Sequence, residues 1–382
     1  MKSAETPLDP LKLHAELRGK ITTQPTSDVT PATLAALYTP GVGEVSRHLA
    51  EHPEAASDYT IRSNSLAVIS DGSAVLGLGN IGPYGAMPVM EGKAMLFKSL
   101  AGINAWPLVL DTQDTEQIIA TIKAVAPSFG AINLEDISAP RCYEIEDRLQ
   151  AELNIPVMHD DQHATAIVVL AGIMNAMKVV GKQLGTARVV VVGAGAAGSA
   201  VARLLIEAGV PDVVLVDSRG IIGLHRTDLD TYKSKWAQIT NPRGLQGDAA
   251  IAFAGADAVV AVSGPGAITP AHIRAMAPGA IVFALANPTP EIDPAAAHAA
   301  GAAVVATGRS DYPNQINNVL VFPGIFKGML ASGVNRVTSE IKLRAAAALA
   351  ELVPHPTPER IIPSVFDEGV ADAVASSVAA VR

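Results

Sequence analysis

The sequence predicts an α/β protein with two units, an N-terminal α/β domain over residues 1–162 and a doubly wound parallel sheet over residues 163–382. From about residue 66, short apolar segments alternate with segments of helical periodicity, which is typical of parallel sheets covered by helices. A four-valine strand runs directly into the glycine-rich turn GAGAAG at 193–198. In addition, 382 residues exceed the length of one ordinary domain.

The N-terminal unit begins with a short predicted helix. Thr30 is suited to a helix N-cap and Pro31 to the first helical position, and proline and glycine at 40–41 end the helix. Beyond it, apolar runs predict strands at 65–72, 74–80, 106–111, 131–137 and 155–161. Helical periodicity predicts helices at 94–102 and 115–126.

The apolar segment 164–181 predicts a helix between the two units. The second unit then starts near residue 187 with strand, glycine turn and helix, followed by a strand at 213–217. Further strands are expected within 257–264, 280–288 and 303–308, and a C-terminal helical stretch that includes 339–353 should pack back against one of the two units.

Composition excludes several classes of protein. The chain is 49% hydrophobic and carries a net charge of −9, which argues against nucleic acid as a partner. It has no apolar run of the roughly 18 residues that a membrane span needs, and no apolar leader, so a cytoplasmic location is expected. The single cysteine, Cys142, excludes an internal disulfide and a multi-cysteine zinc site.

A dinucleotide site is predicted at the glycine turn. Gly193 permits the tight turn, Gly195 lets the backbone approach a pyrophosphate, and Gly198 lets helix and strand pack closely. The helix N-terminus supplies N–H groups for the phosphates. This pattern indicates a Rossmann domain. The expected cofactor-binding residues here are Gly193, Gly195, Ala196, Ala197, Gly198 and Asp217.

The choice between NAD and NADP stays open at this point. Asp217 ends the second strand and is expected to bind the ribose diol, which favours NAD. Arg219, two residues later, could pair with a 2′-phosphate and so favour NADP.

Two acid pairs follow the predicted strands at 131–137 and 155–161. Glu135–Asp136 and Asp160–Asp161 should meet where the strands end, and four carboxylates suit Mg²⁺ or Mn²⁺. His159 and His163 flank the second pair and could instead indicate zinc. We expect a hydrogen-bonded structural role for both histidines.

Two further residues are candidates for acid–base chemistry. Lys93 is expected at the start of a helix, where an ammonium ion is unfavourable. Tyr38 lies in the YTPGVG segment. Both have an ordinary structural alternative, as a surface cation and as a core or turn tyrosine.

In sequence these features together resemble the malic enzymes, in the short bacterial form that lacks a phosphotransacetylase-like extension. The resemblance covers nearly the whole chain. The segments that carry it, in order, are LRGKI, YTPGVG, SDGSAVLGLGNIG, PVMEGKA, INLEDI, HDDQHATA, GAGAAG, ANPTPE and NNVLVFPGIFKG. The family converts malate to pyruvate and CO₂ with NAD or NADP and a divalent metal, Mg²⁺ or Mn²⁺.

The resemblance also implies roles for individual residues. The implied metal ligands are Glu135, Asp136 and Asp161. The implied catalytic residues are Tyr38 as general acid, Lys93 as base and Asp160 as a carboxylate that interacts with this lysine. Asn287 and Asn318 are expected near the nicotinamide and the substrate. A homodimer is expected, with an active site that borrows Tyr38 or Lys93 from the partner chain.

One departure from the family concerns the substrate. Large members carry an arginine before the LGLG segment that binds a substrate carboxylate, and here Ala74 occupies that position. Arg62 or the backbone amides of residues 77–85 are the expected substitutes. The alternatives to the malic enzyme interpretation are a metal-independent Rossmann dehydrogenase of the amino-acid dehydrogenase type and a non-catalytic dinucleotide sensor.

Overall fold

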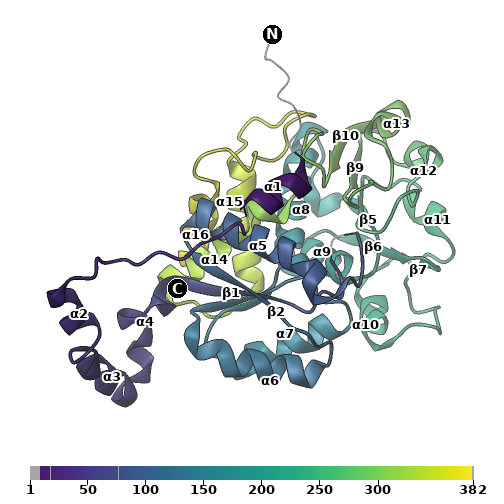
Figure 1. Ribbon diagram of the computed structural model, residues 1–382. Coiled ribbons are helices and arrows are strands. Elements are labelled where there is room, and N and C mark those ends of the chain that lie inside the picture. The colour runs from purple at the N-terminus through teal and green to yellow at the C-terminus, as the bar shows by residue number, and fades with distance from the viewer. Residues whose placement is uncertain (1–8, 18, 76, 381–382) are drawn as a thin grey trace, which may run out of the picture.

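Two sheets organise the chain, whose computed structural model describes residues 9–17, 19–75 and 77–380. One sheet has four strands in the order β2-β1-β3-β4, and the other has six in the order β10-β9-β8-β5-β6-β7. Figure 1 shows the first sheet near the centre and the second on the right. The predicted two-unit α/β fold is confirmed. Residues 1–8, which include the start of the segment examined for a leader, lie outside the described residues.

The four-stranded sheet is entirely parallel. Its strands are β1 (Ser65–Ser70), β2 (Asn104–Val109), β3 (Ala131–Leu134) and β4 (Val157–His159). They are connected by α5 (Gly82–Ala101), α6 (Thr115–Val125) and α7 (Arg141–Glu152). Because the strands are parallel, their carboxyl ends lie on one edge of the sheet, where functional groups of α/β proteins gather.

The six-stranded sheet is the predicted doubly wound sheet. Its strands are β5 (Arg188–Val192), β6 (Asp212–Asp217), β7 (Gly220–Ile221), β8 (Ala258–Ala261), β9 (Ala280–Ala284) and β10 (Ala302–Thr307). Its helices are α9 (Ala196–Glu207), α10 (Thr231–Ile239), α11 (Ala249–Phe253), α12 (Pro270–Ala275) and α13 (Pro294–Ala299). Only the short β7 pairs antiparallel. The strands predicted in this half are confirmed.

A long buried helix, α8 (Asp160–Val179), joins the two units and buries 14 of its 20 residues. A single hydrophobic cluster includes Leu66 of the first sheet, Ile167 of α8 and Phe283 of the second sheet. α14 (Phe322–Ser332), α15 (Ser339–Glu351) and α16 (Val370–Ala379) complete this layer, and α15 packs against α8. None of the described helices is long and apolar enough to cross a bilayer.

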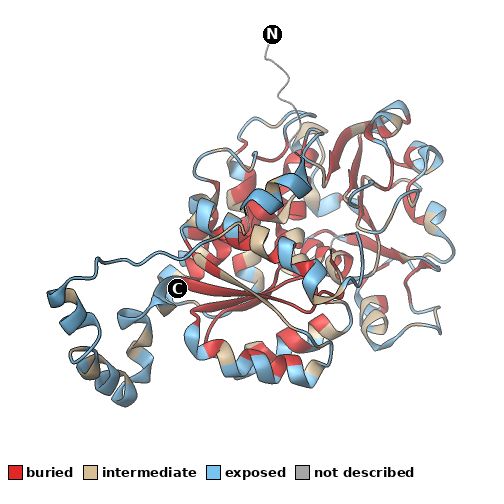
Figure 2. Cartoon of the chain, viewed as in Figure 1, coloured by how far each residue is buried: buried red, intermediate tan, exposed pale blue. Residues whose placement is uncertain are grey.

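The N-terminal segment differs from the rest of the molecule. Its helices are α1 (Pro10–Leu17), α2 (Pro31–Leu37), α3 (Val42–Glu51) and α4 (Ala56–Tyr59), and none of them contains a buried residue. Figures 1 and 2 show α2–α4 extending away from the two sheets with exposed surfaces. The predicted helix after Thr30 is α2, and Thr30 forms a capping box with Thr33.

Two predicted elements need correction, and one element was missed. Residues 74–80 do not form a strand; among those described, Val75 and Gly79 share only an isolated bridge, because glycines turn the chain there. The helix predicted at 94–102 begins at Gly82, so Lys93 lies in its middle and the argument from a helix N-terminus was wrong. α7 was not predicted.

Candidate active site and cofactor groove

The ends of β3 and β4 bring the two acid pairs together. Leu134 and His159, the last residues of these strands, are paired in register. Glu135–Asp136 directly follows β3, and Asp160–Asp161 forms the first turn of α8 directly after β4. Ligand oxygens of Glu135, Asp136 and Asp161 lie within 4.8 Å of one another.

The backbone after β3 is shaped around this cluster. Asp136 has φ 53°, a left-handed conformation that aspartate tolerates better than most residues. Its N–H donates to Asp161 Oδ2 at 2.9 Å, and its carbonyl accepts from the N–H of Ala74 at 2.9 Å. These two hydrogen bonds hold the turn against both α8 and the segment at Ala74.

Lys93 reaches the cluster from the middle of α5 and is 6% exposed. Its Nζ lies 2.8 Å from Glu135 Oε1, contacts Asp160 Oδ2, and sits 4.0 Å from the centre of the Phe322 ring. Asp160 Oδ2 also accepts from Asn318 Nδ2 at 2.6 Å. Lys93 and Asp160, which were expected to interact, are therefore neighbours, and Asn318 joins them.

The charges in this cluster shift the pKa values of its members. Burial by itself lowers the pKa of Lys93, but Asp160 and Glu135 outweigh it and raise the pKa above the usual range. Burial raises the pKa of Glu135 well above its ordinary value, and the neighbouring acids add to this against Lys93. Several carboxylates face one ammonium group, and a divalent cation would neutralise their excess negative charge.

The donor set fits a hard cation. Each of Glu135, Asp136 and Asp161 offers a carboxylate oxygen, the ligand type that Mg²⁺ and Mn²⁺ prefer. The histidine rings are not part of this group of ligands. His159 is fully buried with its Nε2 3.7 Å from Asp161 Oδ2, whereas His163 faces away from the acids.

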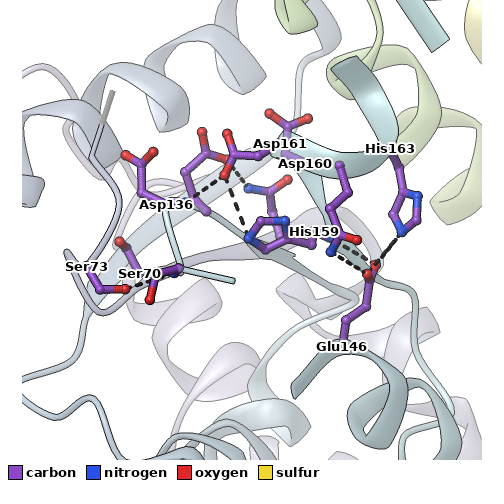
Figure 3. A network of polar contacts seen from close by, with 12 residues as sticks. Ser70, Ser73, Asp136, Glu146, His159, Asp160, Asp161 and His163 are labelled. Carbon is purple, nitrogen blue, oxygen red and sulfur yellow. Dashed lines mark hydrogen bonds and ion pairs between the residues drawn. The ribbon is translucent and has the colours of Figure 1, made fainter. Parts of the chain in front are cut away.

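His163 instead binds Glu146 of α7, a residue that the sequence did not single out (Figure 3). His163 Nε2 lies 2.9 Å from Glu146 Oε1, and the same carboxylate accepts from the His159 N–H at 2.8 Å and from Gln162 Nε2 at 3.1 Å. Glu146 is 4% exposed. This buried carboxylate thus ties α7 to the turn that carries Asp160 and Asp161.

A cavity of about 1040 Å³ connects the acids to the second domain. Lys93, Glu135, Asp136 and Asp161 line it, together with residues 195–198 at the start of α9. A neighbouring hollow of about 640 Å³ continues along the turn to Asp217. A ligand lying across both hollows would have one end at the acids and the other at the edge of the second sheet.

The glycine turn has the geometry expected for a dinucleotide. Gly193 has φ 108°, and a Cβ at Gly198 would lie 1.8 Å from the carbonyl oxygen of Gly193, so neither position tolerates a side chain. At Gly195 nothing lies within 4 Å of where a Cβ would be. Gly195 also precedes α9 without a side-chain cap, which leaves backbone N–H groups for phosphates.

Asp217 is surrounded by positive charge. It accepts from Arg226 Nη1 at 3.0 Å, from Lys233 Nζ at 2.8 Å and from the Arg219 N–H at 2.9 Å. The Arg219 side chain, named from sequence as a phosphate partner, instead pairs with Asp228 at 2.8 Å. The sequence did not indicate Arg226 or Lys233, which are distant along the chain.

Three residues expected near the site lie elsewhere. Tyr38, which caps α2, is 67% exposed on the N-terminal segment. Arg62 donates to the carbonyl of Pro127 at 3.1 Å and does not line the cavity, which corrects the expectation that it anchors substrate. Asn287 lies against Gly77 and Gly308 and lines neither hollow.

Comparison with known proteins matches this architecture to a family. Residues 18–150 match the family model of the malic enzyme N-terminal domain, and residues 163–381 match that of the malic enzyme NAD-binding domain. The chain belongs to the malic enzyme family.

Individual malic enzymes are similar over most of their length. An NAD-dependent malic enzyme from Geobacillus stearothermophilus is 53% identical, over 94% of this chain and 76% of that protein. An NADP-dependent malic enzyme from Halomonas elongata is 48% identical, over 92% of this chain and 82% of that protein. The crystal structure of an NAD-dependent malic enzyme from Thermotoga maritima superposes with a TM-score of 0.94 and 50% identity, covering 98% and 99% of the two chains.

Proposed function

We propose that the chain oxidatively decarboxylates (S)-malate to pyruvate and CO₂, with reduction of NAD⁺ or NADP⁺. The observation that carries this proposal is the shared cavity, which joins a carboxylate cluster suited to a divalent metal to the glycine turn of a dinucleotide site. Both NAD- and NADP-dependent malic enzymes are among its relatives.

In this proposal Glu135, Asp136 and Asp161 hold Mg²⁺ or Mn²⁺. When bound, the ion supplies a Lewis acid for the 2-hydroxyl and the later keto oxygen, and it offsets the negative charge around Lys93. Lys93 then accepts the hydroxyl proton as the hydride leaves C2. To do so it must be neutral, against Asp160 and Glu135, which raise its pKa.

The neighbours of Lys93 orient it. Asp160 contacts its Nζ and is itself held by Asn318, and Glu135 Oε1 lies 2.8 Å from the same Nζ, so the ammonium group is held toward these two carboxylates. The Phe322 ring covers the lysine at 4.0 Å and limits the access of water. We assign Asp160 and Asn318 to positioning Lys93 and the bound reactants, and Asn287 to the nicotinamide side as the family resemblance implies.

We further propose a homodimer in which Tyr38 of the partner subunit protonates C3 after decarboxylation. Tyr38 is exposed, lies outside the cavity of its own chain, and belongs to a segment without buried residues. A second copy of the chain would cover this segment, and the Tyr38 hydroxyl of each subunit would reach the cavity of the other.

Mixing two inactive variants tests the shared site. Tyr38→Phe and Lys93→Ala, refolded together in equal amounts, should form mixed dimers with one intact site each and recover roughly a quarter of wild-type activity. Each variant refolded alone is the control. No recovery from dimers shown to be mixed would contradict the shared site.

The reaction itself is tested by dinucleotide reduction with L-malate and Mn²⁺, run in parallel with NAD⁺ and NADP⁺ and with pyruvate measured as product. EDTA should abolish the activity. Activity that survives EDTA would favour a metal-independent dehydrogenase, and dinucleotide binding without turnover would favour a sensor. The substrate is a small molecule, and we expect the enzyme in the cytoplasm without nucleic acid or membrane partners.

A further inference from the structure

The catalytic residues leave no positively charged side chain free to bind the carboxylates of malate. Its single catalytic ammonium group, Lys93, is already paired with Asp160 and Glu135. Malate brings two more carboxylates into this acidic environment. Ala74 lines the cavity with a methyl group, and Arg62 lies outside it.

Lys20 lines the same cavity from the N-terminal segment. Its Nζ donates to the carbonyl oxygen of Pro88 on α5 at 2.6 Å. The Nζ also lies 3.8 Å from where a Cβ would stand on Gly92, the residue before Lys93. Lys20 therefore approaches α5 next to the catalytic lysine, in a place that Gly92 leaves open.

The Lys20 ammonium group also has N–H donors available for a ligand. No carboxylate of the described residues lies within ion-pair distance of its Nζ, and the bond to Pro88 uses one of three N–H donors. Gly19 precedes it with φ 127°, a conformation that favours glycine and turns the chain toward α5. The flexible lysine stem lets the ammonium group swing from the Pro88 carbonyl to a ligand.

We propose that Lys20 binds a carboxylate of malate and replaces the arginine whose place is taken by Ala74. This rests on the proposed malate oxidation. Lys20 is the second ammonium group among the described residues that line the cavity, and it is the one without an acidic partner. A dianionic substrate bound among four carboxylates gains most from such a charge.

A simpler role for Lys20 would be to tie the N-terminal segment to α5 through Pro88. The two roles predict different kinetics. An anchor of substrate changes the KM for malate and leaves dinucleotide binding intact. A tether changes the melting temperature and disturbs both substrates together.

The test compares Lys20→Met with Lys20→Arg, with Lys12→Met as the control, a 74% exposed lysine of the same segment. Loss of one charged hydrogen bond should raise the KM for malate about 10- to 100-fold in Lys20→Met, while kcat and the KM for dinucleotide change less than about threefold. Lys20→Arg should retain most of the affinity, and Lys12→Met should match the wild type.

L-Lactate as a competitive inhibitor identifies the carboxylate, because it keeps the hydroxyl and the adjacent carboxylate but lacks the second one. An unchanged lactate inhibition constant in Lys20→Met assigns Lys20 to the 4-carboxylate of malate. A parallel rise assigns it to the carboxylate beside the hydroxyl. Either result supports the anchor.

An unchanged malate KM in Lys20→Met, or a joint rise for malate and dinucleotide with a lower melting temperature, would overturn the proposal. Calorimetric titration of L-malate with Mn²⁺ present gives the same comparison without turnover. A wild type that binds malate but does not oxidise it counts against the proposed function alone. An active wild type with an unaffected Lys20→Met variant counts against Lys20 alone.

Discussion

Removing the Glu146 carboxylate should destabilise the protein and loosen the turn that carries Asp160 and Asp161. In Glu146→Ala the His159 N–H and Gln162 Nε2, both buried, lose their acceptor, and His163 loses its partner. Each unsatisfied buried donor costs about 1–3 kcal/mol, so the two donors together cost about 2–6 kcal/mol. We therefore expect a loss of about 3–5 kcal/mol in the free energy of unfolding.

Urea denaturation followed by circular dichroism measures this loss. Because the slope increases with protein size, to about 5 kcal/mol/M for a chain of this length, the midpoint should fall by about 0.6–1 M. Glu144→Ala on the same helix is the control, because its side chain is 50% exposed and its ion pair with Arg148 should contribute less than about 1 kcal/mol. Equal stability of the Glu146→Ala and Glu144→Ala variants would refute the reasoning.

The Glu146 effect should also depend on pH. Burial raises the pKa of this carboxyl, but His163 and the His159 N–H outweigh it and hold the pKa below the ordinary value of 4.5. The ionised group therefore stabilises the fold above the unfolded pKa, and this contribution is lost as pH falls through the folded pKa. The difference in free energy of unfolding between wild type and Glu146→Gln should be largest near neutral pH and should shrink in acid.

Further variants and reagents probe the rest of the site. Lys93→Ala should lose about 10²- to 10⁴-fold in turnover while dinucleotide binding survives, and near-normal decarboxylation would remove Lys93 from the mechanism. Asp161→Ala should lose both activity and Mn²⁺ binding measured by electron paramagnetic resonance, so an unchanged Mn²⁺ affinity would contradict its assignment as a ligand. The Cys142 thiol, whose pKa burial raises to about 12, should not react with a thiol reagent in the native protein at pH 8, and rapid labelling before unfolding would contradict its burial.

Sequence periodicity predicted most of the two sheets because their strands are buried, continuous apolar runs. The segment at 74–80 looked equally apolar, yet its glycines turn the chain and Gly77 packs against the Asn287 carbonyl. Apolar composition alone does not distinguish such a loop from a strand. Lys93 was expected at a helix start because a glycine-rich segment precedes it, whereas the structure includes the last part of that segment, from Gly82, in α5.

Strand-end chemistry predicted that the acid pairs would meet, because parallel strands share a carboxyl edge. The sequence carries no such signal for the residues that tertiary packing brings to the site. Glu146 looks like an ordinary charge on a helix, and its burial depends on how α7 packs against β4 and the start of α8. Arg226 and Lys233 reach Asp217 from a separate loop and from α10, so no short motif contains all three.

The course of α8 has a consequence for any attempt to divide the molecule. The predicted boundary between residues 162 and 163 falls in the first turn of this helix, directly after Asp160 and Asp161. A cut there would leave both carboxylates at the end of one fragment and start the other on an uncapped helix, although α9 and α15, which cover most of that helix, would stay with it. Separating the halves would therefore part the carboxylate cluster and Lys93 from Asn318 and the glycine turn, so neither half would keep the whole cavity.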